Sequence, residues 1–141
     1  MAENKPLTAQ ELGTSAEKKI VDALRKRGFK SIRAPYRSPF DLVVDGARVE
    51  VKCARPTSKG RWVVNFHRHG ILDESKVDAY IVRLMDVPSS LFPIHLVFKA
   101  PTGTLSVGYT FRSLVTDYAS SVENWKLLRS ICNECKGKTN W

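Results

Sequence analysis

The chain has 141 residues and carries 23 lysines and arginines against 14 aspartates and glutamates, for a net charge of +9. This length suits one domain of ordinary size, and the pI of about 9.7 is typical of nucleic-acid binding, since phosphate contacts give sequence-independent affinity. No apolar run approaches the length of about 20 residues that spans a bilayer, and the polar residues 1–6 do not match a secretory signal. We therefore expect a cytoplasmic protein that binds nucleic acid rather than membrane.

The hydrophobic pattern predicts an α/β fold, a single domain with a mixed central β-sheet flanked by helices. Residues 1–12 are expected to form a flexible N-terminal segment, 13–135 the domain and 136–141 a C-terminal tail. The predicted elements are, in chain order, a helix over 14–28, strands over 30–34, 40–45, 47–54 and 61–66, a loop over 67–76, strands over 77–85, 93–99 and 104–108, and helices over 111–119 and 121–133.

The first predicted helix opens with Gly13-Thr14-Ser15-Ala16-Glu17. Thr14-x-x-Glu17 matches a capping box, in which both side chains satisfy free backbone N–H groups at a helix start. A glutamate in a first turn is also favoured by the helix dipole. The local pattern thus assigns Glu17 a capping role. The cations of this helix, Lys18, Lys19, Arg25, Lys26 and Arg27, are predicted to form its solvated face.

Asp45-Gly46 stands between two alternating apolar runs. In this setting Asp-Gly predicts a hairpin with a type I′ turn, because that turn needs positive φ at both central residues. Such a turn pairs residues 44 with 47, 43 with 48, 42 with 49 and 41 with 50. Asp41 would then lie opposite Glu50, with Cβ atoms roughly 5 Å apart, and Lys52 would share their face. The opposite face would be apolar, formed by Phe40, Leu42, Val44, Val49 and Val51.

Like charges placed opposite each other destabilise a sheet unless something compensates them. Mg²⁺ is a natural compensator, since it binds through one or two carboxylates and keeps water and phosphate oxygens as further ligands. Lys52 could orient or deprotonate an attacking water and offset charge on the phosphorus, which together with a metal makes a hydrolysis site. The alternative is that Asp41, Glu50 and Lys52 form the solvated face of an ordinary hairpin, in a chain with 26% charged residues.

Pro39, Asp41, Glu50 and Lys52 resemble the motif of the PD-(D/E)XK nuclease superfamily, which has the restriction-endonuclease-like fold. The opening of the first helix is similar to the Gly-x-x-x-Glu helix of small members, including Holliday junction resolvases and some intron-encoded homing endonucleases. Residues 61–66 and 76–82 resemble the third and following core strands. The similarity covers residues 12–84, and it departs from the literal motif because Phe40 separates the proline from the aspartate.

The resemblance implies a Mg²⁺-dependent DNA endonuclease, with Mn²⁺ as a possible substitute metal. Asp41, Glu50 and Glu17 would be metal ligands, and Lys52 would complete the catalytic set. A homodimer would place two sites on two DNA strands, branched or duplex. Junction resolution, homing and restriction are not distinguished by the sequence. A non-catalytic DNA-binding protein on the same scaffold is the alternative, although an intact Asp41, Glu50 and Lys52 set argues against it, and RNA cleavage stays open.

Segment 55–60 connects the strands predicted over 47–54 and 61–66, and it is rich in turn formers and cations. It is a candidate arm for phosphate contacts or a plain solvated connector. The candidate nucleic-acid-binding residues here and upstream are Arg37, Arg55, Lys59 and Arg61.

The three cysteines do not suggest a disulfide framework, because their number is odd. Cys53 is predicted to face the core by strand alternation. Cys132-x-x-Cys135 is a lone pair near the C-terminus, and a zinc site would need two more ligands such as His67 and His69. A surface pair that can oxidise is the other interpretation. In the last predicted helix, Trp125 belongs to an apolar stripe at helical spacing and is expected in the core.

Overall fold

The computed structural model describes residues 9–35, 38, 40–57, 61–65, 77–86, 93–99, 104–108 and 120–136. These contain, in chain order, α1 (Ala9–Lys26), β1 (Ser31–Arg33), β2 (Leu42–Val44), β3 (Ala47–Ala54), β4 (Arg61–Asn65), β5 (Ala79–Leu84), β6 (Ile94–Phe98), β7 (Thr104–Gly108) and α3 (Trp125–Lys136). The predicted loop 67–76 and helix 111–119 lie outside the described residues. None of the described helices is long and apolar enough to cross a membrane.

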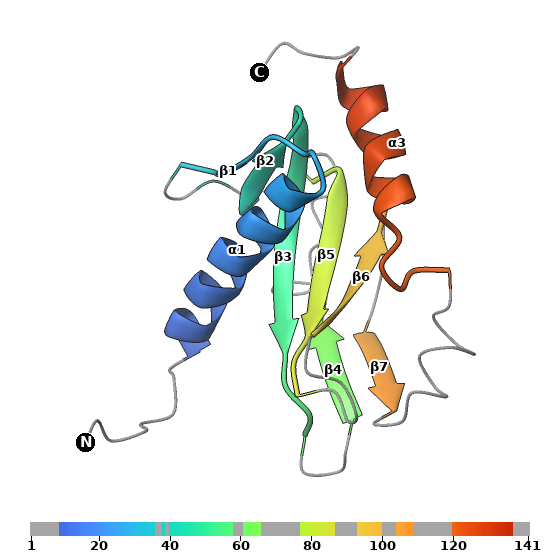
Figure 1. Cartoon of the computed structure of the whole chain (residues 1–141). Coiled ribbons are helices and arrows are strands. Elements are labelled where there is room, and N and C mark those ends of the chain that lie inside the picture. The colour runs from blue at the N-terminus through green and yellow to red at the C-terminus, as the bar shows by residue number, and fades with distance from the viewer. Residues whose placement is uncertain are drawn as a thin grey trace.

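The central sheet has the strand order β1-β2-β3-β5-β6 (Figure 1). Strands β3 and β5 are parallel, and the other neighbours in this sheet are antiparallel. The mixed sheet of the predicted α/β fold is therefore confirmed. The strand predicted over 61–66 is present as β4, but its resemblance to a strand of the core sheet is wrong, because β4 pairs with β7 in a separate two-stranded sheet. Trp62 of β4 is fully buried and its Nε1 donates a 2.8 Å hydrogen bond to the carbonyl oxygen of Met85, which ties β4 to the end of β5.

The two faces of the central sheet bury different sets of side chains. One face packs against both α1 and α3, with Ile20, Leu24, Val49, Ile81 and Leu128 among its buried residues. The other face joins Ala54, Tyr80, Val82 and Leu96 to Trp62 and Val64 of β4. The side chains of β3 alternate between these two faces. Val49 and Val51 belong to the helix-covered face, and Glu50 and Lys52 belong to the opposite face.

Helix α1 begins at Ala9, so the predicted start at Thr14 is wrong, and Thr14 lies inside the helix. The proposed capping box is wrong with it, because a capping residue must stand at the helix start. The sequence contains a second Thr-x-x-Glu pattern, Thr8 to Glu11, that matches the observed start. At the other end, Gly28 has a φ of 86°. The amides of Gly28 and Phe29 donate to the carbonyls of Arg25 and Leu24, which is the hydrogen-bond pattern of a Schellman motif.

The Asp45-Gly46 turn has φ values of 46° and 89°, as a type I′ turn requires. The predicted register is confirmed over β2 and β3, with Leu42 opposite Val49, Val43 opposite Arg48 and Val44 opposite Ala47. The Asp45 carboxylate accepts a 2.8 Å hydrogen bond from Arg129 of α3. The turn thus fixes the hairpin and also binds the last helix.

The cysteines of α3 are inside the protein. Cys132 and Cys135 are buried in the core between α3 and the sheet, so the surface pair expected from the sequence is wrong. The Cys132 thiol donates to the carbonyl of Val44, and burial raises its pKa to about 11. Cys53 lies half-buried on the helix-covered side of β3, in agreement with the expected core-facing position. His67 and His69, the suggested partners for zinc, lie outside the described residues.

Asp78, just before β5, joins the start of β5 to β3. Its carboxylate accepts hydrogen bonds from the Arg48 guanidinium at 3.0 and 3.1 Å and from the Arg48 amide at 2.8 Å. The Asp78 amide in turn donates to the Arg48 carbonyl. Burial acts to raise the pKa of Asp78, but the bonds from Arg48 outweigh it and hold the pKa below the ordinary 3.8.

We expect Asp78→Asn to lower the free energy of unfolding by about 1–3 kcal/mol, because it weakens charge-assisted hydrogen bonds. The folded-state pKa is lowered, so the stability contributed by Asp78 is present above the ordinary value of 3.8 and is lost as the pH falls. Urea unfolding of the wild-type and Asp78→Asn proteins at neutral and acidic pH measures the difference in the free energy of unfolding. Glu134→Gln is the matched control, since its ion pair with Lys99 is more than half exposed and should change stability by less than about 0.5 kcal/mol. Equal effects of the two substitutions at neutral pH would contradict the role of Asp78.

Candidate active site

The candidate site is built from α1 and the β2–β3 hairpin, and the structure describes four of its predicted residues. Glu17 comes from the middle of α1, Asp41 directly precedes β2, and Glu50 and Lys52 lie in β3. The motif residue Pro39 lies outside the described residues. Of the two helices in the described ranges, α1 packs beside β1 and β3, whereas α3 packs beside β3 and β6 (Figure 1).

Regular pairing of β2 with β3 stops at Leu42, one residue short of the predicted Asp41–Glu50 pair. The Asp41 amide donates to the carbonyl of Val49 at 2.9 Å, and the Asp41 carbonyl accepts from the amide of Ala34 at 2.8 Å. The Asp41 carboxylate accepts a 2.8 Å hydrogen bond from the amide of Val51. The direct cross-strand pair with Glu50 is therefore not formed, but the Asp41 side chain still reaches the part of β3 between Glu50 and Lys52.

Glu50 is only 7% exposed, which is uncommon for a glutamate without a partner. Its carboxylate lies 3.5 Å from the Nζ of Lys52. Both residues stand on the face of β3 that also carries Ala54, at the border of the core formed with β4. The sheet therefore holds an acid and an ammonium group together in a largely dehydrated position, where their interaction is screened less than on the surface.

Glu17 extends from α1 toward Arg33 of β1 and toward Asp41. Its carboxylate accepts a 3.0 Å hydrogen bond from the guanidinium of Arg33 in β1. Burial raises the pKa of Glu17, and the nearby charge of Asp41 raises it further, while Arg33 acts to lower it. The net direction is upward, so Arg33 does not fully compensate the two neighbouring carboxyl groups. Glu17 and Asp41, 24 positions apart in the sequence, are thus brought into interaction.

The donor set can be tested against the expected Mg²⁺. Within the described ranges, no three histidine, cysteine, aspartate or glutamate side chains lie close enough together to hold a metal ion. Mg²⁺ commonly binds through only one or two carboxylates and retains waters and phosphate oxygens. Glu17 and Asp41 supply such a pair of oxygen donors, and their mutual repulsion is relieved when a cation lies beside them. These two residues fit the ion, whereas the Glu50 carboxylate is already beside an ammonium group.

The predicted nucleic-acid contacts are described only in part. Arg55, just after β3, and Arg61, the first residue of β4, are exposed. Between them, the amide of Thr57 donates to the Arg61 carbonyl at 2.7 Å, and the Arg61 amide donates to the Thr57 hydroxyl. These bonds hold Arg55 and Arg61 at the ends of one short connection. Arg37 and Lys59 lie outside the described residues.

Sequence analysis missed a second polar cluster, formed by Arg83, His95 and Glu123. Arg83 and His95 are buried and face each other in the paired strands β5 and β6, and Glu123 comes from the turn before α3. No local motif could have revealed it, because the three residues belong to three separate elements.

Comparison with known proteins identifies the fold. The solved structure of a bacterial homing endonuclease, I-Ssp6803I, superposes with a TM-score of 0.69 over 95% of this chain and 100% of that chain, at 17% sequence identity. No protein-family model matches the chain, and no curated protein matches its sequence. The similarity establishes that this chain has an α/β fold like that of the homing endonuclease.

The raised pKa of Glu17 leads to a direct test. In the absence of divalent cations, an NMR titration of the side-chain carboxyl group should give Glu17 a pKa above the ordinary 4.5. Asp41→Asn should lower this pKa by removing a like charge, and Arg33→Gln should raise it by removing the ion pair. Adding Mg²⁺ should lower it in the wild-type protein. If neither Asp41→Asn nor Mg²⁺ changed the pKa of Glu17, the proposed arrangement of the site would be contradicted.

Proposed function

We propose that the protein is a metal-dependent DNA endonuclease that hydrolyses phosphodiester bonds at the site formed by Glu17, Asp41, Glu50 and Lys52. The observation that carries the proposal is the meeting of Glu17 with Asp41, whose carboxylate binds the amide of Val51, the residue between the paired Glu50 and Lys52. The fold shared with a homing endonuclease supports the same class of activity, and the net charge of +9 suits a DNA partner.

Glu17 and Asp41 would hold Mg²⁺, or Mn²⁺ in its place, with Glu50 as the neighbouring carboxylate. The bound ion would supply Lewis-acid stabilisation of the phosphate and a more acidic water. The proposal explains why two partly buried carboxylates, incompletely compensated by Arg33, are held together in the fold.

The protein's own groups account for positioning and charge. Glu50 holds the Lys52 ammonium group at 3.5 Å on a rigid strand, where it can orient the attacking water or offset the negative charge that develops on the phosphate oxygens. Arg33 is about half exposed while it binds Glu17, so its guanidinium can also contact a phosphate that approaches the site. The amide of Val51 fixes the Asp41 carboxylate, which limits reorganisation when substrate binds.

The proposed substrate is DNA, branched or duplex, cut by a homodimer in which each protomer supplies one site. The type of nuclease is tested by comparing cleavage of several DNA substrates. The candidates are a Holliday junction resolvase, a homing enzyme and a restriction enzyme. A second candidate is a DNA-binding protein without catalysis, favoured by one observation: no three-residue metal-binding group is found among the described residues.

Three substitutions test catalysis. Asp41→Asn, Glu50→Gln and Lys52→Ala should each lower Mg²⁺-dependent cleavage by about 100-fold or more, the usual cost of losing a group in acid–base or electrostatic catalysis. Cleavage is measured on a four-way junction, a linear duplex and a single strand, with and without Mg²⁺. Glu134→Gln, an exposed acid-to-amide change in α3, is the control and should cleave as the wild type does.

Cleavage at nearly the wild-type rate by any of the three purified variants would overturn the site assignment. DNA binding without cleavage of any substrate by the wild-type protein, in Mg²⁺ or Mn²⁺, would establish the non-catalytic alternative.

Salt dependence tests the DNA partner. The logarithm of the affinity should fall with the logarithm of the salt concentration by about 0.9 for each phosphate neutralised on a duplex. Arg55→Glu and Arg61→Glu should lower both the affinity and this slope, because both residues are exposed next to β3 and β4. Lys126→Glu on the exposed side of α3 makes the same charge change at a distant position and should affect binding less. Affinity that stays constant between low and physiological salt would contradict a nucleic-acid partner.

A further inference from the structure

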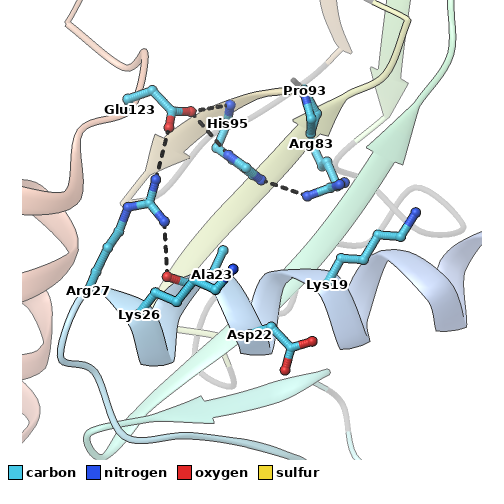
Figure 2. Close-up of a pocket in the computed structure, with 9 residues that line it drawn as sticks. All are labelled: Lys19, Asp22, Ala23, Lys26, Arg27, Arg83, Pro93, His95 and Glu123. Atoms are coloured by element: carbon cyan, nitrogen blue, oxygen red, sulfur yellow. Dashed lines mark hydrogen bonds and ion pairs between the residues drawn. The ribbon is translucent and has the colours of Figure 1, made fainter. Parts of the chain in front are cut away.

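A pocket of about 420 Å³ lies between α1, the ends of β5 and β6 and the turn before α3. Figure 2 shows its lining, in which four cations, Lys19, Lys26, Arg27 and Arg83, accompany two acids, Asp22 and Glu123. Glu17, Asp41, Glu50 and Lys52 are not among its lining residues, so the pocket is separate from the proposed catalytic site.

The inner wall of the pocket is a fixed chain of hydrogen bonds. The NH1 group of Arg83 lies 3.0 Å from Nε2 of His95, and Nδ1 of His95 lies 3.1 Å from Glu123. Because a guanidinium can only donate, Nε2 of His95 must accept, and its proton therefore resides on Nδ1 and is donated to Glu123. His95 thus links the buried Arg83 guanidinium to the Glu123 carboxylate.

Glu123 is fully engaged in this arrangement. It accepts from the backbone amide of His95 as well as from the ring, and it lies 3.6 Å from the Arg27 guanidinium. Burial acts to raise the pKa of Glu123, but the hydrogen bonds from His95 outweigh it, and the pKa lies below its ordinary value. Arg27 also stacks over the ring of Trp125 at 4.6 Å. These contacts fix the acidic side of the pocket.

Arg83 is left incompletely satisfied. The residue is only 8% exposed, and its buried Nε atom has no hydrogen-bond partner among the described residues. Buried donors of this kind are rare, because an unpaired polar group in the interior is costly, and a missing ligand is one explanation. Within the described ranges Arg83 also forms no ion pair with a carboxylate, and its guanidinium contacts the His95 ring instead.

The α1 side of the pocket adds exposed positive charge. Lys19 and Lys26 both line it, and neither forms an ion pair with any other residue in the described part of the chain. They stand seven residues apart, which places them on one side of the helix, two turns from each other. A ligand in the pocket would therefore meet two flexible ammonium groups on one side and the Arg83 guanidinium on the other.

We propose that this pocket binds a phosphate group, held by the guanidinium of Arg83 and by the ammonium groups of Lys19 and Lys26. A phosphate presents several oxygen acceptors around one anionic centre, which suits donors arriving from a strand and a helix on different sides. It would place anionic acceptors beside the Arg83 guanidinium and balance the excess of cations in the lining. The phosphate can belong to a nucleic-acid backbone or to a small phosphorylated molecule, and the proposal does not depend on catalysis at Glu17 and Asp41.

The NMR signal of the Arg83 Nε–H group reports on the site, after assignment by its absence in Arg83→Lys. Inorganic phosphate is titrated into the intact protein without Mg²⁺, and ionic strength is held constant with chloride. We expect a saturable shift of the Arg83 signal. The double substitution Lys19→Gln and Lys26→Gln should weaken phosphate binding about tenfold or more, because it removes two of the three proposed charged donors.

Lys18→Gln is the matched control, because Lys18 is an exposed lysine on the same helix that does not line the pocket. It should leave phosphate affinity unchanged. A short DNA duplex, also without Mg²⁺, distinguishes the sources. If DNA shifts the Arg83 signal and phosphate competes with it, the pocket takes a backbone phosphate. If phosphate alone shifts the signal, the ligand is a small phosphorylated molecule.

The proposal is overturned if neither phosphate nor DNA shifts the Arg83 signal. It is also overturned if Lys19→Gln with Lys26→Gln binds phosphate as tightly as Lys18→Gln does. Because neither measurement uses Mg²⁺ or cleavage, these results are independent of whether the protein proves to be a nuclease.

Discussion

The constraint on which the structure depends most is the two-residue turn at Asp45 and Gly46. Positive φ at both positions fixes the register of β2 against β3, and this register decides which face each following side chain occupies. A shift of one residue would place Glu50 and Lys52 under the helices and move Val49 and Val51 to the opposite face. The turn also holds distant elements: Asp45 accepts hydrogen bonds from Arg129 of α3 and from the amide of Lys30. The same two residues thus position the candidate site and the helix that closes the core.

The candidate site arises where this regular pairing ends. Regular pairing ends at Leu42, and the preceding residue, Asp41, binds Val49 through its backbone and Val51 through its carboxylate. A carboxylate at a regular ladder position would have stood directly across from Glu50, with a repulsion and no partner. The observed geometry turns it toward an amide of β3 and toward Glu17. Each of the three acids is held by a donor of the protein, and burial together with the nearby charge of Asp41 raises the pKa of Glu17.

Much of the fold follows from local sequence, and the failures have identifiable causes. Strand β3 was predicted at its observed bounds, because Asp-Gly and strict alternation act together. The start of α1 was misplaced because the chain contains two Thr-x-x-Glu patterns, and local rules do not choose between them. The partner of β4 could not be predicted, since its pairing with β7 joins residues 61–65 to 104–108. Cys132 and Cys135 were misjudged because their spacing of three places both on the buried side of α3 with Leu128 and Ile131. The Glu17–Asp41 interaction was expected from a family resemblance, whereas the Arg83 cluster required the packing of three elements.

Helix α1 carries charged groups of opposite sign to two separate places. Successive residues of a helix advance by about 100°, so Lys19 and Lys26 lie roughly half a turn around the axis from Glu17. Glu17 therefore faces β1 and Asp41, while the lysines face the pocket beside Arg83 and His95. The buried stripe of Ile20, Val21 and Leu24 anchors the helix to the sheet on the side that carries Glu17. One helix therefore carries side chains of both regions, so a displacement of α1 at the Arg83 pocket would also displace Glu17 relative to Asp41.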